Sequence, residues 1–372
     1  MHQPPAKHVT FVYLGRLQSR GRLLKQIATL QGAGVTCDVV LGNTIAETPD
    51  RAEFNFPITV LPVNENSGRL VSFVNQLRFG RAASRKVAAG GADTVVCLGL
   101  ESLPAGVWAK QLRPSLRLVF DNNELHIESF ENGIKPMVWK PVHNWGVRRS
   151  DVILHAEHNR RDYFRKHYPG SEKPQIVIEN FPFFEEPPAQ RAVPTEKVRV
   201  IYLGGFGKCR FTEEIIDAFA KLPVAISLDI VGFGRPEYVA RLNRRLTDTA
   251  AEHIRLLPAV PYSKIAALLS NYDVGVALYR NTNLNNYYCA PNKVYDYLMN
   301  GMPVIANRYP GLVSVIEGNR VGACVETVDA TSLGRAIESI VSGRMWENIT
   351  PELRRQYSWE LQEAKYLAVY GR

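Results

Sequence analysis

Short apolar runs alternate along the chain with longer segments whose apolar residues recur every three or four positions. The first run, residues 9–14, ends at Gly15, and residues 22–32 follow with the spacing of an amphipathic helix. The runs are rich in β-branched residues and apolar at consecutive positions, as is typical of strands buried on both faces. Such strands alternating with helices predict an α/β fold with parallel sheets.

The same pattern occurs twice, with a proline-rich stretch between its two occurrences. It predicts strands at 35–41, 94–98, 116–120 and 152–155, and again at 198–203, 226–231, 254–257, 274–278 and 303–305. We therefore predict two Rossmann-like, doubly wound domains, with a ligand cleft between them at the carboxyl ends of the strands.

The predicted domain boundaries follow from the position of the proline-rich stretch. They are 1–183 for the N-terminal domain, 184–197 for the linker and 198–350 for the C-terminal domain. The last segment, 351–372, is expected to return to the N-terminal domain. Within it we expect a helix over 351–367 that buries Trp359, Leu361 and Tyr366.

Composition is that of an ordinary globular protein. The chain has 372 residues, 45% hydrophobic and 22% charged, which excludes a collagen, a coiled coil or a disordered chain. No apolar run approaches the roughly 20 residues that span a bilayer, and the N-terminus lacks the pattern of a signal peptide. The five cysteines are never in CxxC spacing, which is typical of reduced thiols and gives no metal site. We expect a cytoplasmic protein.

Charge changes this picture, because basic residues outnumber acidic ones. Lysine and arginine total 45 against 36 acidic residues, and the net charge of +9 favours an anionic partner. Residues 69–86 contain five cations and no acid, namely Arg69, Arg78, Arg81, Arg85 and Lys86. Residues 135–173 add further cations around Trp139 and Trp145.

Two interpretations of these basic segments stay open. They can contact an anionic membrane surface, which would place the protein peripherally at the inner face of the cell membrane. They can equally be solvated helices whose apolar faces pack on the core. No nucleic-acid-binding motif accompanies the charge, so nucleic acid is not an expected partner.

A glycine-rich turn follows the first strand of the second half. Gly204, Gly205 and Gly207 lie between a strand and a helix, and Lys208 and Arg210 come directly after them. Such a turn lets backbone N–H groups approach an anion at a helix N-terminus. The pattern is neither GxGxxG nor a P-loop, so a phosphate cradle and a purely structural turn both fit it.

A second motif combines a cation and a carboxylate on one helical turn. Pro291 can open a helix that Gly301 ends before a buried strand. Lys293 and Asp296 are three residues apart and lie on one side of this helix. They are either a surface ion pair, or a cation for phosphate and a carboxylate for sugar hydroxyls.

With these motifs, the C-terminal half resembles the nucleotide-sugar-binding domain of family 4 glycosyltransferases, which are retaining enzymes of the GT-B fold. The resemblance is carried by Ile201-Tyr-Leu-Gly-Gly, Leu228-Asp-Ile-Val-Gly-Phe-Gly, Tyr272-Asp-Val-Gly-Val-Ala-Leu and residues 291–306. The N-terminal half agrees more loosely, through Leu118-Val-Phe-Asp-Asn-Asn-Glu-Leu and Arg149-Ser-Asp-Val-Ile-Leu.

The resemblance implies a donor site, whose residues we assign to positions of this sequence one by one. Asp296 stands where the family has the second Glu of a Glu-x7-Glu motif, which holds the donor ribose, and Tyr288 replaces the first Glu. Lys293, in a Pro-x-Lys sequence that some members share, is then the expected diphosphate contact. Arg210 stands at a family Lys position and its guanidinium suits a diphosphate, whereas Gly205 replaces a family Arg. The other positions expected at the donor are Gly15, Gly204, Lys208, Gly232, Ala290 and Pro291.

In the N-terminal half, the resemblance points to residues that face the acceptor. Asp121-Asn-Asn-Glu124 is similar to an Asp-Ala-His-Glu stretch of the family, and Asn123 replaces its histidine. Glu124 either orients the acceptor hydroxyl or is a solvated loop carboxylate. His126 lies close by in sequence. The candidate catalytic residues are therefore Glu124, Asn123, Arg210 and Lys293.

The resemblance implies a retaining glycosyltransferase that needs no metal ion and no cofactor besides its co-substrate, a UDP- or GDP-linked sugar. The expected acceptor is a glycan or a lipid-linked glycan in envelope polysaccharide or glycoconjugate synthesis. Two alternatives stay open at this point. One is a sugar-nucleotide epimerase of the same fold, and the other is a non-catalytic subunit that binds a sugar nucleotide or a glycan.

Overall fold

The structure is a computed structural model, and it describes residues 5–17, 21–43, 54–63, 69–130, 134–170, 172–186, 194 and 196–372. The chain forms two compact units. The N-terminal unit comprises Met1–Glu179 and Gln362–Arg372, and the C-terminal unit comprises Asn180–Leu361. Much of the predicted linker, 184–197, lies outside the described residues, so its role stays a prediction.

The described part of the N-terminal unit contains one parallel sheet of seven strands, in the order β3-β2-β1-β4-β5-β6-β7. The strands are β1 (His8–Leu14), β2 (Thr36–Asn43), β3 (Ile58–Pro62), β4 (Thr94–Leu98), β5 (Arg117–Asn122), β6 (Val152–His155) and β7 (Gln175–Val177). The strands β3 and β7 were not predicted. Both lie at sheet edges, and most of their residues are only half-buried, whereas every residue of the central strands β4 and β6 is buried.

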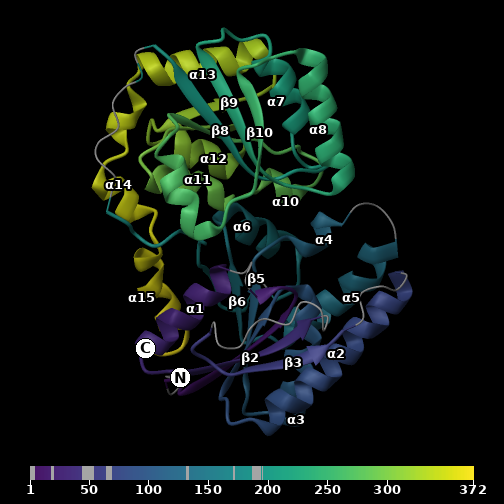
Figure 1. The fold of residues 1–372 in the computed structure, drawn as a ribbon. Coiled ribbons are helices and arrows are strands. Elements are labelled where there is room, and N and C mark those ends of the chain that lie inside the picture. The colour runs from purple at the N-terminus through teal and green to yellow at the C-terminus, as the bar shows by residue number, and fades with distance from the viewer. Residues whose placement is uncertain are drawn as a thin grey trace. The chain divides into compact units, whose positions relative to one another are not determined.

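Helices cover this sheet, as Figure 1 shows in purple to teal. They are α1 (Gly21–Gly32), α2 (Arg69–Ala89), α3 (Leu103–Leu112), α4 (His126–Ser129), α5 (Ile134–Arg149) and α6 (His158–His167). Helix α3 packs against both α2 and α5. Trp139 of α5 is buried in the core and lies edge-on to Phe73 of α2. It is therefore not available for the surface contact with a membrane that was one interpretation of the basic segments.

The C-terminal unit also contains one parallel sheet, with six strands in the order β10-β9-β8-β11-β12-β13. The strands are β8 (Val198–Gly205), β9 (Ile226–Phe233), β10 (Ile254–Pro258), β11 (Val274–Ala277), β12 (Val304–Asn307) and β13 (Gly322–Val325). The main helices are α7 (Thr212–Phe219), α8 (Pro236–Thr249), α9 (Ile265–Leu269), α10 (Leu284–Tyr287), α11 (Asn292–Met299), α12 (Pro310–Ile316), α13 (Ala330–Ser342) and α14 (Pro351–Gln356).

Successive apolar residues of the central strand β8 enter two different cores. Val200 and Tyr202 pack on one face of the sheet with α7 and α13, whereas Ile201 and Leu203 pack on the other face with α11 and α12. Consecutive strand side chains point to opposite faces, so the buried part of a strand covered on both sides is apolar at consecutive positions. The two parallel-sheet, Rossmann-like domains predicted from this pattern are confirmed.

The C-terminal segment differs from the single returning helix that was predicted. It forms α14 in the C-terminal unit and α15 (Trp359–Val369), which the boundary between the units divides. Within the N-terminal unit α15 lies beside α1 (Figure 1), where Thr29 donates a hydrogen bond to Glu363 over 3.0 Å. Trp359 and Tyr366 are buried as expected, but Leu361 is 51% exposed.

None of the helices in the described ranges is both long and apolar enough to cross a membrane.

Candidate functional site

The strand order of the C-terminal sheet reverses between β8 and β11, and ligands of such sheets bind at the carboxyl ends of the strands on either side of this point. Two glycines shape the edge. Gly204, with φ +131°, is the last residue but one of β8, and Gly232 pairs with it from β9. A Cβ atom on Gly232 would lie 1.8 Å from the Gly204 carbonyl oxygen, so only glycine fits there.

Helix α11 reaches this edge because another glycine lets it approach the sheet. A Cβ atom on Gly275 of β11 would lie 2.4 Å from the ring of Tyr297. With no side chain there, the Tyr297 hydroxyl enters the sheet and accepts a hydrogen bond from the Leu203 N–H over 3.0 Å. The first turn of α11, which carries Lys293, is thereby fixed beside the end of β8.

The Lys293 ammonium is enclosed by aromatic rings and has no hydrogen-bond acceptor in the described chain. Its Nζ atom lies 4.1 Å from the centre of the Tyr202 ring and 5.1 Å from that of Tyr279. The atom is buried and makes no hydrogen bond with a described residue. Burial, together with the nearby Arg210 guanidinium, lowers the pKa of Lys293 well below its usual value.

Arg210 reaches the same ring from the glycine-rich loop. Its guanidinium carbon lies 4.2 Å from the centre of the Tyr279 ring, and Nη1 donates to the Cys209 carbonyl over 3.1 Å. The loop is held in turn by Arg280, whose Nε donates to the Arg210 carbonyl over 3.0 Å.

Arg210 and Lys293 thus share one aromatic ring, and neither forms an ion pair with a carboxylate among the described residues. The nearby Glu214 pairs with Arg280 instead. Two cations held together without a counter-charge repel each other, and a polyanion between them relieves this. The N-terminus of α11 adds backbone N–H groups, so the site is suited to a diphosphate.

Asp296 lies one turn further along α11 and does not pair with Lys293, so the ion-pair interpretation of these two residues is wrong. The Asp296 carboxylate instead accepts a hydrogen bond from the hydroxyl of Tyr262 over 3.2 Å. Tyr262 is 70% exposed. The carboxylate is therefore within reach of a ligand's hydroxyl groups as well as of this tyrosine.

The remaining candidates of this unit take different places around the two cations. Pro291 is the N-cap of α11 with Ala290 just before it, and Gly205 is the last residue of β8. The Tyr288 ring lies edge-on to Tyr287, 5.0 Å between centres. Lys208 is exposed on the glycine-rich loop and forms no hydrogen bond, ion pair or cation–ring contact with a described residue.

The candidates of the N-terminal unit lie at the corresponding edge of its own sheet. Gly15, with φ +141°, follows β1, and Asn123 and Glu124 follow β5. The Asn123 carbonyl accepts a hydrogen bond from Arg160 over 2.7 Å. Glu124 is half-buried and makes no hydrogen bond or ion pair with a described residue.

Asp121, the first residue of the acceptor-like stretch, has a structural role. It is buried and accepts hydrogen bonds from Arg22 over 2.9 and 3.0 Å and from Gln26 over 2.7 Å. These hydrogen bonds hold α1 against β5, and Asp121 has no solvent-exposed surface.

Sequence reasoning missed several polar and aromatic groups at these two edges. In the N-terminal unit, Glu101 and His126 both approach Gly99, which has φ +79°, and the Nε2 atom of His126 is buried without a described partner. In the C-terminal unit it missed Tyr202 and Tyr279. Their only sequence sign is an aromatic residue near the carboxyl end of a buried strand, where a core residue is equally expected.

Three solved structures show the class of fold. Sucrose-phosphate synthase from Thermosynechococcus elongatus matches with a TM-score of 0.79 at 17% identity, over 98% of this chain and 98% of that one. HepE from Anabaena, solved with UDP and glucose, matches with 0.76 at 15%, over 98% and 99%. The apo lipopolysaccharide outer core galactosyltransferase WaaB matches with 0.69 at 12%, over 98% of each chain. The fold is that of the GT-B class.

The sequence of the C-terminal unit matches a known family. Residues 183–359 match the family described as Glycosyl transferases group 1. The match includes the whole of the cluster around Arg210 and Lys293. No curated protein matches the chain in sequence.

Proposed function

We propose that the protein is a retaining, metal-independent glycosyltransferase of family 4, which moves a sugar from a UDP- or GDP-linked donor to a glycan or lipid-linked acceptor. The observation that carries this proposal is the pair of unneutralised cations, Arg210 and Lys293, at the strand-order reversal of a group 1 domain. That HepE was solved with UDP and glucose supports a sugar nucleotide as the donor.

In the proposed complex, the diphosphate lies against Lys293, Arg210 and the N-terminus of α11. Gly204 and Gly232 allow close approach of the donor to the backbone, and Asp296 accepts hydrogen bonds from the ribose hydroxyls. Tyr288, Ala290, Pro291, Gly205 and Lys208 border this site. Lys293 then exchanges its contacts with aromatic rings for a charge-assisted hydrogen bond, which is the stronger interaction.

The proposed reaction needs no protein nucleophile. The bond between the sugar C1 and the phosphate oxygen breaks and its electron pair leaves with the diphosphate. The acceptor oxygen attacks C1 on the same face, and its proton passes to the departing phosphate oxygen. Arg210 and Lys293 neutralise the charge that develops on the leaving group, and this contributes more in the transition state than in the ground state.

We assign the acceptor to the N-terminal unit, at the edge where Asn123 and Glu124 follow β5, and Gly15, which follows β1, stays a proposed contact of the donor. Glu124 is the candidate for orienting the acceptor hydroxyl, because it is half-buried at the end of β5 and has no described partner of its own. A lipid-linked acceptor in envelope glycan synthesis would place the protein peripherally at the inner face of the cell membrane.

The first experiment is a thermal-shift screen of the full chain against nucleoside diphosphates and their sugars, in EDTA. We expect stabilisation by one nucleoside diphosphate and by its sugar conjugate, since binding to the native state raises the unfolding temperature.

A second experiment separates the enzyme from the alternatives. The stabilising nucleotide sugar is incubated with the protein, and proton NMR follows its slow hydrolysis. Release of the α-sugar from an α-linked donor supports retention. Inversion at C2 identifies an epimerase, and binding without turnover identifies a non-catalytic subunit.

A further inference from the structure

Cationic side chains without acidic partners gather on neighbouring helices of the N-terminal unit. Exposed cations on α2 and α5 include Arg78, Arg81, Arg85, Lys140, Arg148 and Arg149. None of these six forms an ion pair with a residue in the described ranges. The C-terminal unit differs, because many of its arginines pair with a carboxylate, namely Arg199, Arg241, Arg245, Arg255, Arg280, Arg308 and Arg344.

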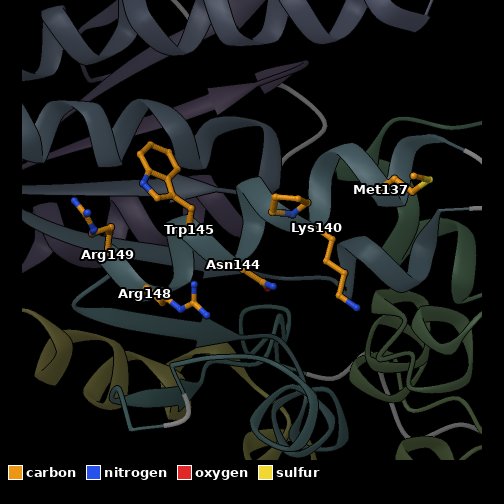
Figure 2. Close-up of a pocket in the computed structure, with 7 residues that line it drawn as sticks. Met137, Lys140, Asn144, Trp145, Arg148 and Arg149 are labelled. Atoms are coloured by element: carbon orange, nitrogen blue, oxygen red, sulfur yellow. The ribbon is translucent and has the colours of Figure 1, made fainter.

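Three of the six cations line a groove on α5 (Figure 2) of ≈ 730 Å³. Its lining residues are Met137, Lys140, Pro141, Asn144, Trp145, Arg148 and Arg149. Lys140, Asn144 and Arg148 are spaced by four residues and extend to the same side of the helix, whereas Trp145 extends to the other side (Figure 2). The groove has the size of a small-molecule site and presents cations and an amide beside apolar surface.

Exposed apolar side chains occur on the same helices. In the described part of the N-terminal unit, the large hydrophobic residues that stay exposed are Val74 on α2 (43%), Leu112 on α3 (61%) and Met137 on α5 (76%). Aromatic contacts link the three helices. The Arg81 guanidinium lies 5.7 Å from the centre of the Trp108 ring, and Trp108 lies 6.1 Å from Trp145.

We propose that α2, α3 and α5 form a docking surface for an anionic lipid bilayer, with phospholipid phosphate groups in the α5 groove. A bilayer surface offers negative charge and an apolar layer just beneath it, which matches exposed, unpaired cations on the same group of packed helices as the exposed Val74, Leu112 and Met137. A dissolved polyanion such as RNA would use the cations but not these apolar side chains. The inference rests on the function proposed above, because docking to a membrane would give the enzyme access to a membrane-anchored acceptor.

The test is co-sedimentation of the full chain with vesicles of pure phosphatidylcholine, or with 30% phosphatidylglycerol added, in the absence of nucleotide. We expect binding to the anionic vesicles only, and release as salt rises because the attraction is screened. The triple variant Lys140→Gln, Arg148→Gln, Arg149→Gln should bind about 100-fold more weakly. The triple variant Arg165→Gln, Lys166→Gln, Lys221→Gln removes the same charge from other exposed positions and should bind like the wild type.

A second pair of variants tests the apolar part of the surface at constant charge. Met137→Ser should weaken binding to anionic vesicles by about 10- to 150-fold, the loss that corresponds to exposing one large apolar side chain. Val224→Ser changes a side chain that is 73% exposed in the C-terminal unit and should leave binding unchanged.

Several results would overturn the proposal. They are equal binding to neutral and anionic vesicles, no binding to either, or equal losses in the two triple variants. Tighter binding to a labelled single-stranded RNA than to anionic vesicles, lost in the α5 variant, would assign the surface to nucleic acid. Because no nucleotide is present, failure here is distinct from failure of the donor site, and the thermal shift with UDP should be the same in every variant.

Discussion

Replacing Lys293 by Met should stabilise the free protein and weaken nucleotide binding at the same time. In the free protein the buried Nζ atom makes no hydrogen bond with a described residue. A buried polar group without a partner costs about 1–3 kcal/mol, and contact with the Tyr202 ring at 4.1 Å offsets part of this cost. Methionine has a similar length and carries no charge, so we expect a gain of about 1–2 kcal/mol in the free energy of unfolding.

The same substitution removes the proposed diphosphate contact. Hydrogen bonds to charged groups contribute about 1.5–3 kcal/mol, so the Kd for UDP or GDP should rise about 10- to 150-fold. Urea unfolding of the free protein and calorimetric titration with the nucleotide measure the two effects separately. Lys221→Met, which changes an exposed lysine of the same unit, should alter neither quantity.

The stabilisation should also depend on pH with a defined sign. The pKa of Lys293 in the folded protein lies well below its usual value of 10.5. The unfolded chain therefore binds more protons than the folded one between these two pKa values, and the wild type loses stability as pH falls through this window. The advantage of Lys293→Met should be larger at pH 7 than at pH 10. A variant that is less stable than the wild type, with unchanged affinity for the nucleotide, would refute the reasoning.

Three further predictions concern stability and the site's backbone. Burial raises the pKa of Glu179 to about 7, so the folded protein loses stability as pH rises toward 7. Glu179→Gln should therefore raise the melting temperature at pH 8 but not at pH 4. Burial lowers the pKa of His143 to about 3, so the folded protein loses stability as pH falls below 6.5. Urea unfolding at pH 7 and at pH 4.5 measures this loss, and His143→Phe should make it smaller. Gly232→Ala should lower the free energy of unfolding by at least about 1–3 kcal/mol and weaken UDP binding, because its Cβ would meet the Gly204 carbonyl. Gly207→Ala should lower the free energy of unfolding far less, because a Cβ there meets nothing within 4 Å.

Sequence pattern was sufficient for the fold because central parallel strands are apolar at several consecutive positions and helices are not. Val200, Ile201 and Tyr202 illustrate this, since successive residues enter opposite cores. The pattern was insufficient where an element is only half-buried or is interrupted. The edge strands β3 and β7 are mostly half-buried, and the predicted terminal helix is interrupted before Trp359. Leu361, which was expected to be buried, is exposed.

For the candidate site, the sequence indicated the cations but not what surrounds them. The resemblance pointed to Arg210, Lys293 and Asp296 by position. It could not indicate that Tyr279 would be shared by both cations, because this contact joins residues that are 69 and 14 positions apart in the chain. Likewise, the spacing of Lys293 and Asp296 fitted either an ion pair or two separate ligand contacts. In the structure the Lys293 side chain lies against buried rings and the Asp296 carboxylate accepts a hydrogen bond from Tyr262.

The most direct test of the central claim is a crystal structure of the full chain with the nucleoside diphosphate that stabilises it most. Our account predicts diphosphate oxygens within about 3 Å of Lys293 Nζ and of the Arg210 guanidinium, with the ribose hydroxyls on Asp296. A nucleotide bound elsewhere, with Lys293 still enclosed between Tyr202 and Tyr279, would contradict it.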